Sequence, residues 1–276
     1  MFQRFLVSLI LILGLCSSAY SSIDLNGDAD YVSTTTMGNF GTSLDTNRLT
    51  LSLWIKTTTT TSMIFYGTVN SGSTTAINMN LNLSPALSVA TGRVHIFRRD
   101  ENNNYFRTGV AIDMGVTDGE WHNIILSIGK DSPNSTIWVD GVSQPITAGG
   151  FYGDGVADNM ANFDFPIFIG DYNNRGNPIT PYFNGEINEV YMWSTATALE
   201  QWEVDSLASA RGKRIGLQIR PSEQYDYHPF DQGSDGTPLS TTADFYKDIS
   251  GNGNHGTGVD VNGDSLNVAE SVLSYP

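Results

Sequence analysis

Basic residues are scarce in this sequence of 276 residues, which has 14 Lys and Arg against 29 Asp and Glu and a formal net charge of −15. A surface of this charge repels nucleic acid and anionic lipid, so the sequence predicts no nucleic-acid partner and no membrane insertion. Cysteine is nearly absent too. The single cysteine, Cys16, lies close to the N-terminus, and one cysteine excludes a disulfide framework within the chain.

Long apolar runs are lacking except near the N-terminus. There, Arg4 precedes an apolar stretch over residues 5–15, and small residues follow it. This order is typical of a cleaved secretory signal, and the run is short for a membrane span. We expect cleavage after Ser21, with cleavage after Ala19 as an alternative. Two further alternatives are an uncleaved anchor and a lipoprotein in which Cys16 carries the lipid. The prediction is a secreted or cell-surface protein.

Helical periodicity is also lacking before residue 195. Short β-type runs separated by Gly, Asn, Asp and Pro take its place, and the chain contains 28 Gly. This pattern predicts an all-β sandwich or barrel. We expect strands over residues 31–33, 49–56, 63–68, 76–83, 93–98, 105–110, 122–128, 135–139, 166–169, 185–193 and 217–220.

One helix is expected, from Ser194 to Ala210. Ser194 or Thr195 can cap its N-terminus, because a hydroxyl can accept a hydrogen bond from a free backbone N–H group. Three apolar side chains follow helical spacing and are expected to pack on the sandwich. They are Leu199, Trp202 and Leu207.

Five segments, taken in order, carry a family resemblance. They are Asp30-Tyr31-Val32 at the end of an acidic first strand, the strand 51–56 with Trp54, Asp118-Gly119-Glu120-Trp121-His122, the hairpin Trp138-Val139-Asp140-Gly141, and the strand 183–193. Together they resemble the laminin G-like group of the concanavalin A-like lectin and glucanase superfamily. The resemblance implies an antiparallel two-sheet jelly-roll sandwich, with six or seven strands in each sheet and one short helix after the closing strand. It also implies a structural role for His122.

The C-terminal part departs from the family order. Residues 227–234 and 248–257 resemble the segment with which such domains usually begin. Three explanations stay open: the segment folds back onto its own sandwich, it is the stub of a second module, or it donates a strand to a neighbouring copy. We expect a signal peptide over 1–21, a laminin G-like jelly roll over 22–214 and a C-terminal segment over 215–276.

Catalytic motifs are absent from the sequence. The glucanases of the superfamily carry a Glu-x-Asp-x-(x)-Glu motif, and the nearest match here is Glu186-Ile187-Asn188-Glu189. In a regular strand Glu186 and Glu189 would point to opposite faces, which does not suit paired carboxylate catalysis. We therefore expect no enzyme activity, with a divergent glycoside hydrolase as an alternative.

Calcium is the expected cofactor, because it binds carboxylate and amide oxygens on loops. The resemblance implies a site where the first strand meets the closing strand, although Asn188 stands at the acidic position of the latter. A second acidic loop contains Asp154 and Asp158. Residues 260–264 open like a calcium loop, but we interpret them as a turn. The candidate metal ligands are Asn26, Asp28, Asp30, Asn188, Asp154 and Asp158.

An amide-rich loop with an aromatic residue is the expected ligand site. It consists of Asp171, Tyr172, Asn173, Asn174 and Arg175. The predicted function is an extracellular, non-catalytic module that recognises a glycan or a glycosylated surface with the help of calcium. The alternative from another class is a structural surface or fibre subunit, which self-associates through its C-terminal segment.

Overall fold

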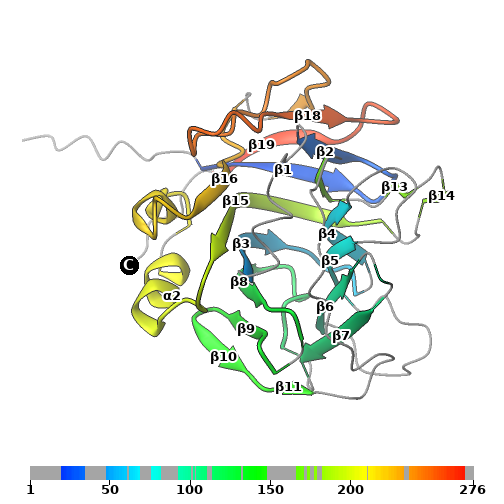
Figure 1. Cartoon of the computed structure of the whole chain (residues 1–276). Helices are drawn as coiled ribbons and strands as arrows, with labels where there is room; N and C mark the ends of the chain where they lie inside the picture. The colour runs from blue at the N-terminus through cyan, green and yellow to red at the C-terminus, as the bar shows by residue number, and fades with distance from the viewer. Residues whose placement is uncertain are drawn as a thin grey trace, which may run out of the picture.

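Two antiparallel β-sheets lie face to face in the computed structural model of the chain (Figure 1). Sheet A runs in the order β10 (Val142–Gln144), β9 (Thr136–Val139), β8 (Trp121–Ile128), β3 (Arg48–Lys56), β15 (Asn184–Thr195), β1 (Tyr20–Asn26), β19 (Leu266–Glu270) and β17 (Thr237–Pro238), with β16 (Gln224–His228) paired to β15. Sheet B runs in the order β11 (Ile146–Thr147), β7 (Tyr105–Val110), β6 (Val94–Arg99), β5 (Ala76–Leu81), β4 (Ser62–Thr68), β12 (Phe168–Ile169), β2 (Tyr31–Thr34) and β18 (Gly256–Val259). A separate two-stranded ribbon joins β13 (Asn173–Asn174) to β14 (Asn177–Pro178).

The described residues are 20–34, 48–60, 62–68, 76–81, 93–100, 102, 104–110, 114–131, 133–147, 166–170, 173–174, 177–178, 182–209, 211–232 and 236–270. Among them the two sheets contain nine and eight strands, more than the six or seven per sheet that the resemblance implies. The additional strands of the larger sheet include β16, β17 and β19, which come from the C-terminal segment.

The core between the sheets follows from strand alternation. In β3 the apolar residues 49, 51, 53 and 55 are buried and belong to the central cluster, together with Ile124 of β8 and Ile187 of β15. Successive side chains of a strand point to opposite faces, so the residues between these ones lie on the outer face of sheet A.

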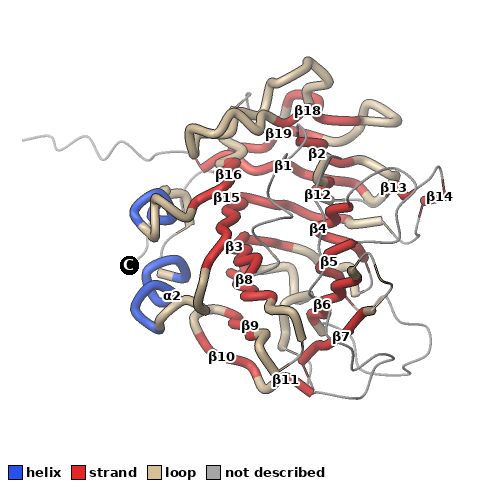
Figure 2. Tube along the Cα trace, viewed as in Figure 1, coloured by secondary structure: helices blue, strands red, loops and turns tan. Residues whose placement is uncertain are grey.

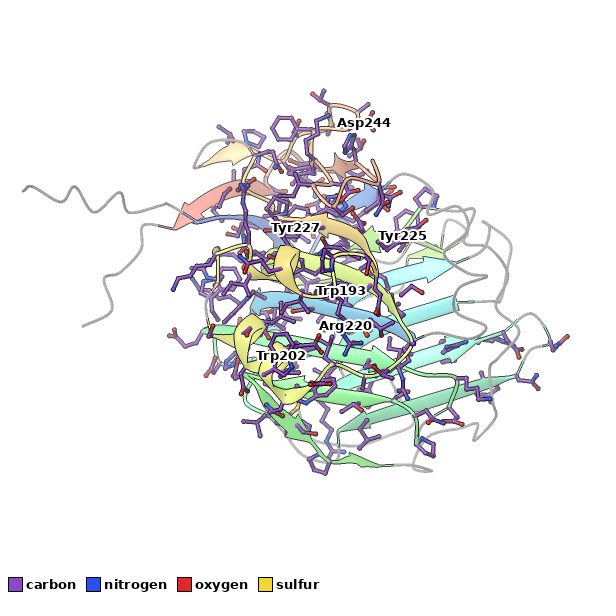
Figure 3. All side chains as sticks on the ribbon, turned by 60° about the vertical axis from the view of Figure 1, so that its left-hand side comes forward. Trp193, Trp202, Arg220, Tyr225, Tyr227 and Asp244 are labelled. Atoms are coloured by element: carbon purple, nitrogen blue, oxygen red, sulfur yellow. The ribbon has the colours of Figure 1, made fainter. Side chains whose placement is uncertain are left out.

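A second apolar cluster covers part of that outer face. Helix α2 (Gln201–Ala208) and the 3-10 helix η1 (Ile215–Gln218) lie over it, and both helical segments lie on the same side of the molecule (Figure 2). Trp193 and Tyr227 are fully buried in this cluster, between the sheet and the overlying segments (Figure 3). Tyr191 stacks on both, with ring centroids 5.5 Å from Trp193 and 3.9 Å from Tyr227.

A buried ion pair ties α2 to the turn after η1. Arg220 donates from Nε to Oε1 of Glu203 and from Nη2 to Oε2, each at 2.7 Å, and Nη2 also donates to the carbonyl of Ala198 at 3.1 Å. The Glu203 side chain is 4% exposed. Its Oε2 accepts the N–H of Glu200 at 2.7 Å, so one carboxylate closes the helix N-terminus and anchors the neighbouring turn.

Three expectations for this region are wrong. The helix begins at Gln201 with Glu200 as its N-cap, because Ser194 and Thr195 still belong to β15. Leu199 and Leu207 are buried as expected, whereas Trp202 is 59% exposed and extends away from the sheet (Figure 3). Residues 217–220 do not form a strand, since the chain turns into η1 through Arg214 in a left-handed conformation (φ 53°).

The remaining strand predictions agree with the structure to within a few residues. Residues 105–110 coincide with β7, and the predicted strand 49–56 lacks only the first residue of β3. Residues 82 and 83 of the predicted strand 76–83 lie outside the described residues.

The C-terminal segment pairs with strands from the rest of the same chain. β16 pairs with β15, β18 with β2, and β19 with β1. The order of the elements along the chain therefore differs from their order in the sheets: β1 lies in sheet A between β15 and β19.

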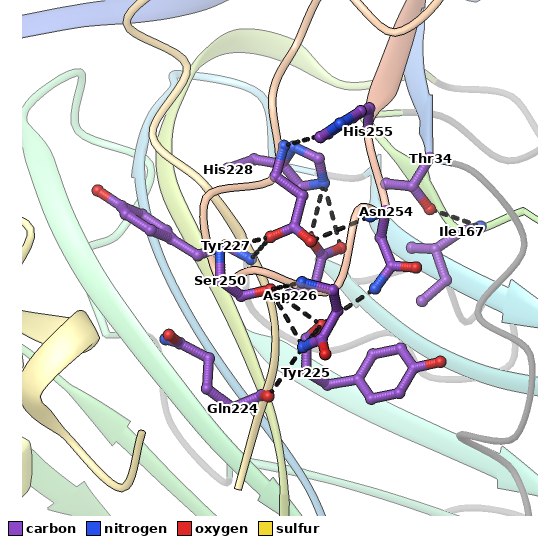
Figure 4. A network of polar contacts seen from close by, with 12 residues as sticks. Thr34, Ile167, Gln224, Tyr225, Asp226, Tyr227, His228, Ser250, Asn254 and His255 are labelled. Atoms are coloured by element: carbon purple, nitrogen blue, oxygen red, sulfur yellow. Dashed lines mark hydrogen bonds and ion pairs between the residues drawn. The ribbon is translucent and has the colours of Figure 1, made fainter. Parts of the chain in front are cut away.

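A buried polar network holds this segment together (Figure 4). Asp248 accepts the backbone N–H groups of Tyr227 at 3.0 Å, Ser250 at 2.8 Å and Asn254 at 3.0 Å. These hydrogen bonds outweigh burial and lower the pKa of Asp248 below its usual range. Beside it, Nε2 of His228 lies 3.1 Å from Asp226, and both side chains are fully buried. The motif at 248–255 thus closes a turn against β16.

Candidate functional site

Two loops cross between the sheets side by side at one end of the sandwich. The first joins β1 to β2 over residues 27–30, and the second joins β18 to β19 over residues 260–265. β1 pairs with β19 in sheet A, and β2 pairs with β18 in sheet B. The loops therefore begin and end on neighbouring strands, although the bonded residues Asp30 and Val261 are 231 positions apart.

Hydrogen bonds join the two loops directly. Asp30 accepts the N–H of Val261 at 2.7 Å on one carboxylate oxygen and the hydroxyl of Ser265 on the other. The Asn262 amide donates to Asp28 at 3.0 Å. In addition, the side-chain amide of Asn26 donates to Asp264, and that of Asn184 to the Asn26 carbonyl at 2.8 Å.

Three carboxylates converge in this arrangement. Asp30, Asp260 and Asp264 each offer an oxygen atom, and these oxygens lie within 4.8 Å of one another. Asp30 is buried, Asp260 half-buried and Asp264 exposed. Burial raises the pKa of Asp30, and the charges of the two other aspartates raise it further, against the hydrogen bonds from Ser265 and Val261. Three like charges at this spacing repel one another unless a cation lies between them.

The geometry fits a hard divalent cation. Oxygens that bind one Ca²⁺ at about 2.3–2.6 Å cannot be more than about 5 Å apart, and the three aspartate oxygens meet this limit. The ligands are all oxygen atoms of carboxylates, with amides and backbone carbonyls nearby, which is the donor set that calcium takes. These residues could therefore hold a metal ion.

Of the predicted metal ligands, Asp30 is one of the three converging carboxylates, while Asn26 and Asp28 hydrogen-bond to residues of the second loop. Asn188 does not belong to this site. It is buried in β15, where its amide donates to the carbonyl of Ser21 and, at 3.0 Å, to that of Pro229. Asn188 lies four residues along β15 from Asn184, the partner of Asn26, and is therefore about 13 Å away at the usual rise of a strand.

The other predicted site residues lie largely outside the described part of the chain. Asp154, Asp158, Asp171, Tyr172 and Arg175 are not described. Asn173 and Asn174 form β13, whose backbone pairs with β14. The amide-rich ligand loop stays a prediction.

Asp260 and Asp264 are the site residues that the sequence analysis missed. The sequence of residues 260–264 opens like a calcium loop, but its pattern predicts a turn. It is a turn, in which the N–H of Gly263 bonds to Asp260 at 2.6 Å. The pattern of residues 260–264 does not show that this turn lies beside the loop of Asp30, which supplies the buried carboxylate.

The two glutamates of the closing strand lie on the same face of sheet A. β15 has a register shift opposite β3 between Asn188 and Tyr191, and Glu189 adopts a left-handed backbone conformation (φ 49°). The bulge turns Glu189 towards the outer face, where its carboxylate accepts the N–H groups of Gly212 at 2.7 Å and Arg214 at 2.9 Å. Burial raises the pKa of Glu189. Its carboxylate thus anchors the loop after α2.

His122 links two of the recognised motifs. Its Nδ1 lies 2.7 Å from Asp140 and its Nε2 lies 3.0 Å from Asp118. The hydrogen bond to Asp140 is the largest cause that raises the pKa of His122 to about 9, against partial burial. The imidazolium therefore holds the Asp-Gly-Glu-Trp-His turn against the Asp-Gly hairpin at neutral pH.

The fold and the loops together define a lectin-like jelly roll with a candidate metal site at one end. The family model Laminin_G_3, described as the concanavalin A-like lectin/glucanases superfamily, matches residues 26–204. The match covers well over half of the sequence, and the chain belongs to this family. Among curated proteins no sequence matches it.

Three solved structures are similar to the chain. A candidate carbohydrate-binding protein from Bacteroides ovatus is 14% identical, with a TM-score of 0.55, over 92% of this chain and 61% of that one. The heptameric SAP-like pentraxin of Limulus polyphemus is 15% identical (TM-score 0.48) over 69% of this chain and 82% of that one. Domains LG4-5 of the mouse laminin alpha1 chain are 18% identical (TM-score 0.44) over 66% of this chain and 44% of that fragment. Within the described residues, no helix is long and apolar enough to cross a membrane.

Proposed function

We propose that this protein is an extracellular, non-catalytic binding module that recognises a glycan or a glycosylated surface with the help of a calcium ion. The observation that carries the proposal is the convergence of Asp30, Asp260 and Asp264 on two crossing loops. The ion would occupy the space between these carboxylates. It would stabilise the loops and present its remaining coordination positions to hydroxyl groups.

The charge of the site supports the calcium part of the proposal. The pKa of Asp30 is raised, so its carboxylate is ionised at an energetic cost that a bound cation would remove. A ligand that binds only the folded protein adds about 2.7 kcal/mol of stability at a concentration a hundred times its dissociation constant. Calcium should therefore raise the melting temperature.

Family and fold support the glycan part by analogy. The superfamily is named for lectins and glucanases, and the Bacteroides ovatus structure is that of a candidate carbohydrate-binding protein. The absence of a free carboxylate pair in the closing strand favours binding over hydrolysis, since Glu189 is occupied by backbone N–H groups.

Export is part of the proposal, and strand β1 bears on the cleavage position. Tyr20 and Ser21 pair with Glu270 and Ala269, and the Ser21 carbonyl accepts the amide of Asn188. Cleavage after Ala19 would keep these contacts, whereas cleavage after Ser21 would remove them. Mass spectrometry of the secreted protein distinguishes the two masses.

The C-terminal segment is proposed to complete its own sandwich, in a circularly permuted order. The pairing of β19 with β1 and of β18 with β2 supports this proposal. The fibre-subunit alternative requires these strands to exchange between copies. A concentration-independent monomer in light scattering would support self-completion, and polymers would support the alternative.

The calcium proposal is tested by melting the protein in calcium and in chelator, alongside the variants Asp260→Asn and Asp264→Asn. We expect a higher midpoint in calcium for the natural protein and a loss of that shift in both variants. Glycan-array binding in the same two buffers tests the recognition. An unchanged midpoint would refute the calcium site, and an array without binding in either buffer would favour the structural alternative.

A further inference from the structure

The segment 211–214, between the two helical segments α2 and η1, concentrates positive charge in an acidic chain (Figure 2). It reads Arg211-Gly212-Lys213-Arg214, and no other four consecutive residues of the sequence include three basic ones. Lys213 and Arg214 are exposed, and 49% of the Arg214 side chain is accessible to solvent. Endoproteases with acidic specificity pockets recognise basic side chains of this kind. The segment therefore has the chemistry of a proteolytic site.

A second pair of adjacent basic residues provides an internal comparison. Arg98 and Arg99 follow one another in β6, which pairs with β5 on one side and with β7 on the other. Arg98 is fully buried, and its Nη1 donates to the carbonyl of Gly129 at 3.0 Å. Proteolysis takes place at exposed loops and not within a strand that is paired on both sides. Of the two basic pairs in the sequence, only Lys213-Arg214 is therefore open to a protease.

The carboxylate of Glu189 holds the backbone of this segment. It accepts the N–H groups of Gly212 at 2.7 Å and Arg214 at 2.9 Å, and the Arg214 carbonyl accepts the N–H of Leu217 at 3.2 Å. Gly212 and Arg214 have left-handed backbone conformations, with φ 77° and 53°. Residues 211–214 form no strand, so these bonds can open locally while both sheets stay intact. A protease gains access to the bond after Arg214 through such an opening.

The part of the chain after Arg214 is bound to the part before it by contacts that a cut leaves in place. Its strands β16, β18 and β19 pair with β15, β2 and β1. Phe230 and Tyr246 contribute fully buried side chains to the central core. In addition, Nε1 of Trp193 donates to the carbonyl of Ile219 at 2.9 Å. A cut after Arg214 therefore leaves one folded unit composed of two chains.

We propose that the peptide bond between Arg214 and Ile215 is a processing site for an endoprotease that recognises paired basic residues. Water adds across this bond, so that Arg214 gains a carboxylate and Ile215 an ammonium group. The sequence has a single cysteine, so the two chains stay together through the shared sheets and not through a disulfide. Cleavage removes the covalent tether of the C-terminal strands, and non-covalent binding alone then retains them. This processing requires neither the metal site nor a glycan.

The test uses the complete secreted protein and two enzymes: trypsin, which reads only the basic residue before the cut, and a subtilisin-like endoprotease that requires a basic pair. We expect both enzymes to cut first after Arg214 and to release a fragment that begins at Ile215, identified by mass spectrometry. Lys213→Gln should slow the pair-specific enzyme at least about a hundredfold and leave trypsin almost unaffected, because only the former reads this position. Lys247→Gln is the matched control, since Lys247 is a single exposed lysine.

Size-exclusion chromatography of the cleaved protein should give one peak that contains both fragments. A first tryptic cut at Lys130, at Lys247 or in the Arg98-Arg99 pair would overturn the proposal, because the segment would then be closed to proteases. Equal rates for Lys213→Gln and the natural protein with the pair-specific enzyme would refute recognition of the pair. Fragments that separate on the column would refute the two-chain unit. Protein isolated from its host without any fragment that begins at Ile215 would refute natural processing, whatever the outcome of the calcium and glycan experiments.

Discussion

Replacement of Arg220 by methionine should destabilise the protein strongly, because it leaves the Glu203 carboxylate buried without its partner. Removal of one member of a buried ion pair costs about 3–5 kcal/mol. Arg220 is 15% exposed, so we expect the lower end, about 3 kcal/mol. For a chain of this size, this corresponds to a midpoint lowered by roughly 6–12 °C.

The chain contains a matched control for this change. Arg214 also pairs with a carboxylate, that of Asp231, but the two side chains are 49% and 30% exposed. Exposed pairs contribute about 0.2–1 kcal/mol, so Arg214→Met should have a small effect. Urea unfolding followed by tryptophan fluorescence measures both variants in one assay.

The pH dependence of the stability difference between the natural protein and Arg220→Met gives an independent check. Burial raises the pKa of Glu203, but the hydrogen bonds from Arg220 and Glu200 outweigh it, and the net pKa is lowered. The stabilisation is therefore complete above the ordinary glutamate pKa and is lost as the pH falls through the lowered one. We expect natural protein and Arg220→Met to converge in stability at low pH. The reasoning would be refuted if Arg220→Met and Arg214→Met lost equal stability at pH 7. It would also be refuted if the stability difference between the natural protein and Arg220→Met grew as the pH falls.

Two further predictions concern other parts of the fold. Because the pKa of His122 is raised from 6.5 to about 9, chiefly by Asp140, its stabilisation is complete below pH 6.5 and disappears as the pH rises through about 9. His122→Gln should therefore melt below the natural protein at pH 6 and close to it at pH 10, and a gap independent of pH would contradict the assignment. Gly185→Ala should destabilise by about 2–4 kcal/mol, since a Cβ atom would lie 2.3 Å from the Lys56 carbonyl at a φ of 145°. Gly236→Ala, with φ 68° and nothing within 4 Å, is its control in chemical denaturation, and an equal loss would show that backbone strain alone is responsible.

Strand alternation predicted the sandwich well where one face of a strand is apolar. β3 follows this pattern, with its buried apolar residues at every second position. β16 was missed because side chains on both of its faces are buried, so its sequence does not alternate between apolar and polar residues. Its fully buried residues include Asp226 and His228. A strand with buried charged residues looks polar in a sequence, and only tertiary contacts reveal why it is tolerated.

Of the three converging carboxylates, the sequence pattern singled out only Asp30. Asn26, Asp28 and Asp30 stand at alternate positions of one short segment, so a local pattern was sufficient to select them as candidates. Asp264 reaches them only because β19 pairs with β1, a contact that no local pattern contains. The bulge at Glu189 had the same limitation, since alternation assumes a regular strand. The division of the chain at residues 21 and 214, and the ligand loop at 171–175, remain predictions.

The position of β1 has a consequence for how the molecule folds. β1 is synthesised early, but its two neighbours in sheet A are β15 and β19, and Ser22 bonds to a residue 246 positions later. Contacts of such separation are slow to form, because a long loop must close before any stabilisation is gained. The first strand therefore has no partner in sheet A until β15 has been made, and it lacks its second partner until β19, the last strand, has been made. A nascent chain of this design cannot complete sheet A strand by strand, and the sheet closes only after the C-terminal segment has been synthesised.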